Sequence, residues 1–147
     1  MTAKEYLQQI YRADVHINIL VRQKSDLQAQ LYRGSGSIQI KERVQTSPDG
    51  DPYIRLIAKI DGIERKINQE IDQLVDLKQT IIKQITALDN PRHVEVLYDR
   101  YVLLMKWEEI YVVMGYSELS PCTRLHGRAL RTFAKKFGLK NGPKKSI

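Results

Sequence analysis

The chain has little of several features that would mark particular protein classes. Its 147 residues include a single cysteine, so no disulfide can form within one copy. No apolar run approaches the roughly 18 residues that a membrane-spanning helix needs, and no leader pattern opens the sequence. We therefore expect a cytoplasmic protein without membrane contact, made of one domain or two small ones.

Acidic residues are missing from the C-terminal end. Residues 1–90 hold 13 Lys and Arg against 12 Asp and Glu, whereas residues 91–147 hold 11 against 5. From Ser120 onward there are eight Lys and Arg and no Asp or Glu. Nearly all of the net charge of +7 lies in this C-terminal part. The asymmetry favours a polyanionic partner there over a basic tail kept for solubility.

Residues suited to catalysis or metal binding are sparse. Cys122 and His126 lie four residues apart on one expected helix, and both fall towards its apolar side. We interpret this thiol as a small core residue rather than a nucleophile. Two candidate ligands do not make a zinc site. The sequence thus predicts that the chain is not an enzyme and takes no metal or cofactor.

Two long amphipathic segments occupy the N-terminal part. A capping box of Thr2 and Glu5 opens a helix expected over about 2–33, and its apolar residues recur in steps of three and four. A second helix is expected over about 53–88. Glycine and proline gather in segment 34–52, which we interpret as the loop of an antiparallel helical hairpin. One helix pair gives little core, so we expect it to dock on the C-terminal domain or on a second copy.

Three shorter helices are expected after this pair, over about 91–104, 106–114 and 121–137. Gly115 ends the second of them, because glycine most easily adopts the left-handed conformation that terminates a helix. Ser120 is expected to cap the third, with Pro121 in its first turn.

The third of these helices has two chemically different faces. Its apolar side carries Cys122, Leu125, Ala129, Phe133 and Phe137. Its opposite side carries a narrow stripe of Arg124, Arg128, Arg131 and Lys135. A short helix, a glycine turn and a second helix with an outward cationic stripe fit the DNA major groove.

Position along this helix assigns candidate contacts to double-stranded DNA. Residues near its start are candidates for base contact, namely Ser120, Thr123, Arg124 and Arg128. Residues further along are candidates for phosphate contact, namely Arg131, Lys135 and Lys136. For Glu118 in the preceding turn, we favour a capping role over contact with a cytosine amino group.

Several short motifs carry a family resemblance. They are Leu97-Tyr98, Arg100-Tyr101, Trp107-Glu108-Glu109-Ile110, Met114-Gly115-Tyr116-Ser117 and Arg124-Leu125-His126-Gly127. Together they resemble region four of sigma factors, and more narrowly the phage and prophage proteins of Gram-positive bacteria that carry a sigma-region-four-like helix-turn-helix. N-terminal pieces such as Ala3-Lys4-Glu5-Tyr6-Leu7 also match that group in type, so the resemblance spans nearly the whole chain. It implies DNA binding and transcription control of phage genes.

The sequence as a whole predicts an all-α protein. Residues 1–88 form the hairpin, residues 89–138 the helix-turn-helix domain, and residues 139–147 a basic tail. We expect a sequence-specific DNA-binding transcription regulator in the bacterial host cell, with the hairpin serving for homodimer formation or for contact with RNA polymerase. The alternative is a coiled-coil adaptor or structural protein whose basic helix binds an acidic partner.

Overall fold

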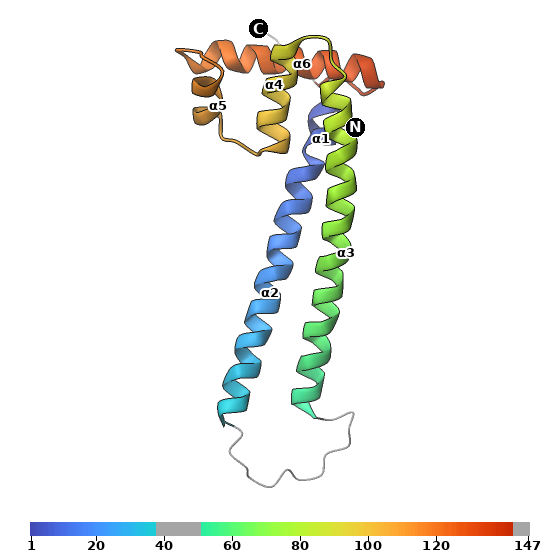
Figure 1. The fold of residues 1–147 in the computed structure, drawn as a ribbon, viewed down its shortest axis with the longest axis vertical. Coiled ribbons are helices and arrows are strands. Elements are labelled where there is room, and N and C mark those ends of the chain that lie inside the picture. Colours follow the sequence, from blue (N-terminus) through green and yellow to red (C-terminus); the bar gives the residue numbers. More distant parts are fainter. Residues whose placement is uncertain (38–50, 143–147) are drawn as a thin grey trace. The chain divides into compact units, whose positions relative to one another are not determined.

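The computed structural model describes residues 1–37 and 51–142, and all regular structure in these ranges is helical (Figure 1). The expected all-α class is therefore confirmed, with no strand in the described ranges. Most of the expected 34–52 loop, residues 38–50, lies outside them. None of the described helices combines the length and the apolar character needed to cross a membrane.

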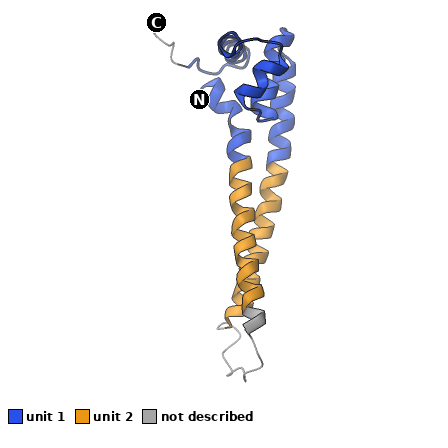
Figure 2. Cartoon of the chain, turned by 90° about the vertical axis from the view of Figure 1, so that its left-hand side faces the viewer, with its two compact units in different colours: residues 1–13, 74–147 blue, residues 14–73 orange. Residues whose placement is uncertain are grey.

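The helices follow one another in a simple order. They are α1 (Ala3–Leu7), α2 (Gln9–Ser37), α3 (Pro52–Thr86), α4 (Pro91–Leu97), the π-helix η2 (Tyr98–Val102), α5 (Trp107–Val113) and α6 (Leu119–Phe137). The chain divides into two compact units (Figure 2). Unit 1 contains residues 1–13 and 74–147, and unit 2 contains residues 14–73.

The first expected helix begins as predicted but is interrupted once and ends later than predicted. Thr2 caps α1 as expected: its hydroxyl accepts from the Glu5 amide at 3.2 Å, and the Glu5 carboxylate accepts from the Thr2 amide at 2.9 Å. The helix is interrupted at Gln8, and α2 then continues to Ser37 rather than ending near residue 33. Glycine costs only about 1 kcal/mol within a helix, which is too little to force an end at Gly34.

The helix expected over 91–104 is shorter and changes type. Asn90 caps α4 by accepting from the Arg92 amide at 2.9 Å. From Tyr98 the chain widens into η2, in which the Leu103 amide donates to the Tyr98 carbonyl, five residues back, at 3.0 Å. η2 ends at Val102, and Leu104 in the connection to α5 takes a positive φ of 56°.

Unit 2 consists of the α2 and α3 segments lying side by side. His16 pairs with Glu70, and Lys24 pairs with Glu64 at 3.7 Å. A residue further along α2 thus meets one earlier in α3, so the two segments run in opposite directions. Lys24, which interrupts the apolar stripe of α2, is held by this ion pair. The buried residues among those described in this unit are Ile17, Leu20, Ile60 and Ile67.

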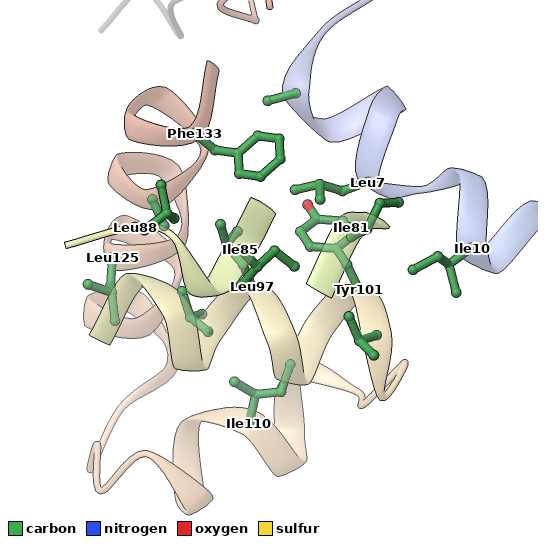
Figure 3. Close-up of a cluster of buried hydrophobic side chains, with 14 of the residues drawn as sticks. Leu7, Ile10, Ile81, Ile85, Leu88, Leu97, Tyr101, Ile110, Leu125 and Phe133 are labelled. Carbon is green, nitrogen blue, oxygen red and sulfur yellow. The ribbon is translucent and has the colours of Figure 1, made fainter. Parts of the chain in front are cut away.

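The core of unit 1 draws on every helix in it (Figure 3). Its largest fully buried aliphatic side chains include Leu7 and Ile10 from the N-terminus and Ile81 and Ile85 from the end of α3. Fully burying such a side chain contributes about 1.5–3 kcal/mol. The compact unit therefore begins well before residue 89, because the short C-terminal helices bury their apolar faces against α1 and the last turns of α3.

Backbone hydrogen bonds hold the first residues after α6 in unit 1. Gly138 ends the helix with φ of 67°, and the Leu139 amide donates to the Ala134 carbonyl at 2.9 Å. The Lys140 amide donates to the Met1 carbonyl at 3.3 Å. The first residues of the expected 139–147 tail thus belong to unit 1, whereas residues 143–147 lie outside the described ranges.

Candidate nucleic-acid interface

The turn between α5 and α6 is built on Gly115, as the sequence predicts. Gly115 has φ of 80°, in the left-handed region that glycine enters at least cost. The Tyr116 amide then donates to the Tyr111 carbonyl at 2.9 Å, which closes the end of α5. Ile110 within α5 and Met114 at its C-terminal end are buried, so α5 is fixed by its apolar face.

The start of α6 differs from the expectation. Glu118, not Ser120, occupies the N-cap position, and its side chain makes no capping hydrogen bond. Ser120 lies in the first turn, where its carbonyl accepts from the Thr123 hydroxyl at 2.9 Å. Pro121 does not fix the start, because every amide in the first turn of a helix lacks an intrahelical acceptor. A proline therefore fits at any of these positions.

The two faces of α6 separate as the sequence predicts. The buried side contains Cys122, Leu125, Ala129 and Phe133, with Phe137 half-buried. The opposite side carries four exposed cations, Arg124, Arg128, Arg131 and Lys135, which we call the basic stripe. Ser120 and Thr123 are also exposed. The helix can therefore present these side chains to a ligand without unfolding.

Lys136 differs from the other cations of α6. Its ammonium group donates to the Ala87 carbonyl, just past the last turn of α3. A cation near a helix C-terminus satisfies a carbonyl that has no partner within the helix. Lys136 thus helps to hold α6 in unit 1, although its side chain remains exposed.

An aromatic cluster holds the middle of α6. The His126 Nε2 atom lies 2.7 Å from the Tyr101 hydroxyl oxygen. The His126 and Trp107 rings are in edge-to-face contact, with their centroids 4.7 Å apart. The sequence indicated that His126 would pack on a neighbouring helix but did not identify these partners. Burial lowers the pKa of His126 to about 4, with Lys4 and Arg100 adding to the effect, and burial raises the pKa of Tyr101.

Two arginines that the sequence did not single out fix the ends of α5. Arg100 donates to the Met105 carbonyl at 3.0 Å and lies 4.9 Å from the centre of the Trp107 ring. Arg92 donates to the Met114 carbonyl at 3.1 Å and lies over the Tyr116 ring at 4.9 Å. Cation–π contacts of this kind contribute about 0.5–1 kcal/mol at exposed sites. Helical periodicity gives no signal for such contacts, because they join different elements.

Nucleophilic and metal-binding chemistry finds no geometric support in the described part of the chain. Cys122 is fully buried, and burial raises the pKa of its thiol, which disfavours the reactive thiolate. No group of three or more His, Cys, Asp or Glu side chains among the described residues could hold a metal ion.

Comparison with known proteins adds no family to this geometry. No family model, curated protein or solved structure matches the chain. The residues themselves, above all the basic stripe and the contacts that hold α6, therefore indicate the function.

Proposed function

We propose that this chain is a sequence-specific DNA-binding transcription regulator of phage or prophage genes, with α6 entering the major groove. The observation that carries the proposal is the basic stripe, four exposed cations on the face of α6 opposite its buried side. Four like charges along one helix face repel one another, and an anionic partner would offset that cost.

The arrangement around α6 supports a helix-turn-helix. α5, the Gly115 turn and α6 follow in the order of that motif, and α6 packs against α1, α4 and α5. Arg124 and Arg128 near the start of α6 are our candidates for base contact, with Ser120 and Thr123 beside them. Arg131 and Lys135 are our candidates for phosphate contact. Lys136 is a weaker candidate because its ammonium group donates a hydrogen bond to the Ala87 carbonyl.

The paired helical segments of unit 2 support the proposal that this hairpin binds a partner. Among the described residues of unit 2, four large aliphatic side chains are buried and six are exposed, namely Val15, Ile19, Val21, Ile54, Ile57 and Ile71. We propose that this hairpin joins two copies, because a dimer contacts two DNA half-sites about one helical turn apart and gains affinity from both. RNA polymerase is the other partner to be tested.

The exposed aliphatic residues of unit 2 also support a second candidate function. In an adaptor protein, the hairpin would be the functional part and the basic stripe would bind an acidic protein. The two functions differ in what the stripe recognises. A regulator prefers one DNA sequence over bulk DNA, whereas an adaptor shows no such preference.

The deciding experiment is selection of bound fragments from random duplex DNA, followed by affinity measurements on the selected site across a range of salt concentrations. We expect affinity to fall steeply as salt rises, since each phosphate contact releases counterions. In the Arg124→Ala/Arg128→Ala double variant, the preference for the selected site should disappear, and affinity should approach that for bulk DNA.

The matched control is the Arg65→Ala/Lys66→Ala double variant. It removes the same charge from exposed positions of α3 in unit 2. This control should keep the sequence preference of the unmodified chain. If the stripe variant selects the same site as the control, the assignment of α6 as the reading helix is wrong.

A further inference from the structure

A second candidate binding site lies in unit 1, where the end of α3 and the following loop meet α4 and η2. An open hollow of about 440 Å³ occurs there. Its apolar lining includes Leu88, Val94 and Tyr98, and its carboxylates are Asp89, Glu95 and Asp99. No residue of α6 lines it, so this site is separate from the basic stripe.

Asp99 is the residue that makes this hollow unusual. The residue as a whole is only 8% exposed, and among the described residues it is the one charged residue that is buried. Its Oδ2 atom is fully buried and has no hydrogen-bond partner. An unpaired buried carboxylate is unfavourable by several kcal/mol unless a cation or a proton compensates it.

The surroundings of Asp99 do not supply that compensation. Burial raises the pKa of Asp99, and the nearby carboxylate of Glu95 raises it further. No ion pair between described residues involves Asp99. A cation bound in the hollow would compensate the ionised form of this carboxylate.

The apolar lining decides what kind of cation would fit. A hydrated metal ion needs several oxygen or nitrogen ligands, and the described residues hold no such group. The methylene groups of a long side chain could pack against Leu88, Val94 and Tyr98. A guanidinium group at the end of that side chain can donate several N–H hydrogen bonds to carboxylates at once. We propose that this hollow binds an arginine side chain of a protein partner, with its guanidinium group beside Glu95 and Asp99, where its positive charge compensates the buried carboxylate.

The test uses the full chain and two short peptides. One is acetyl-Ala-Arg-Ala-amide. The other carries citrulline, which has nearly the same shape as arginine but no charge. We expect the arginine peptide to shift the amide NMR signals of residues lining the hollow, with affinity on the order of millimolar. The citrulline peptide should bind at least about tenfold more weakly.

The decisive variant is Asp99→Asn, with Asp76→Asn at an exposed position of α3 as the matched control. Asp99→Asn should reduce binding of the arginine peptide at least about tenfold, and Asp76→Asn should leave it unchanged. Asp99→Asn removes a buried charge and should fold. If it does not, Glu95→Gln provides the same test and must also weaken binding.

Three results would overturn the proposal: equal binding of the citrulline peptide, unchanged binding by Asp99→Asn, or no saturable shift with the arginine peptide. The inference does not depend on DNA binding. Asp99→Asn should keep the affinity of the chain for duplex DNA, so failure of either proposal can be recognised separately.

Discussion

At the scale of single residues, His126 links α6 to the elements beneath it. It bonds to Tyr101 of η2 and meets Trp107 of α5 from a half-buried position on α6. A protonated imidazole in this position would lose solvation and would face the positive charges of Lys4 and Arg100. The packing of α6 against η2 and α5 therefore requires the neutral form of His126.

This requirement predicts a pH dependence of stability. The pKa of His126 is about 4 in the folded chain against an ordinary 6.5, so the unfolded chain takes up the proton first as pH falls. Its stabilising contribution is fully present above pH 6.5 and is lost as pH falls towards 4, by on the order of 3 kcal/mol. Urea denaturation across this range measures the loss.

The variant His126→Gln should show a smaller loss over the same range, because it removes the titrating group. NMR titration of the imidazole provides the direct check on the cause. A His126 ring that gains its proton near pH 6.5 in the folded chain would contradict this explanation.

At the scale of elements, the turn between α5 and α6 depends on the backbone of Gly115. A Cβ atom built there meets nothing within 4 Å, so any cost of substitution comes from its φ of 80°. A left-handed conformation costs residues other than glycine about 1–2 kcal/mol. We expect Gly115→Ala to lower the free energy of unfolding by that amount, as measured by urea denaturation.

Gly62 provides the matched control for this prediction. It lies within α3, and a Cβ atom built there also meets nothing within 4 Å. Because alanine favours a helix over glycine by about 1 kcal/mol, Gly62→Ala should be stabilising. Equal effects of the two substitutions would show that the conformation of Gly115 does not matter.

Local features of these elements were predictable from the sequence where neighbouring residues determine them. Helices begin after the capping residues Thr2 and Asn90 and end at Gly138, as these residue types predict. The apolar and basic faces of α6 follow from the helical periodicity of its sequence. The start of α6 was not predictable from Ser120, because several first-turn positions satisfy a proline equally well.

Features that depend on contacts between distant residues escaped sequence reasoning. The widening at η2 and the role of Tyr101 depend on packing against other elements, which periodicity does not report. Nothing in the sequence around Asp99 indicates that it is buried without a hydrogen-bond partner for Oδ2. The two candidate sites thus differ: the basic stripe is visible in the sequence, whereas the hollow appears only in three dimensions.

At the scale of the whole molecule, the proposed partner surfaces occupy different units. The basic stripe and the hollow belong to unit 1, and the exposed aliphatic residues Val15 and Ile19 belong to unit 2. Substitutions in unit 2 should therefore change self-association without changing which bases are preferred within one DNA half-site.

We expect the free chain, of 17.1 kDa, to sediment at twice that mass. Val15 and Ile19 are exposed one helical turn apart on α2, and Val15→Lys/Ile19→Lys should yield monomers by placing charges in the apolar contact. The control Ser25→Lys/Gln28→Lys adds the same charge at exposed polar positions and should remain dimeric. Sedimentation equilibrium distinguishes these outcomes, and a monomeric unmodified chain would rule out the dimer.

The position of Trp107 has a practical consequence. It is the sole tryptophan of the chain, and its ring contacts both the Arg100 guanidinium and the His126 ring. The intrinsic fluorescence of Trp107 therefore reports on the packing contact between α5 and α6. Any ligand, substitution or change of solvent that weakens this contact will alter the emission, so the chain carries its own optical reporter and needs no attached dye.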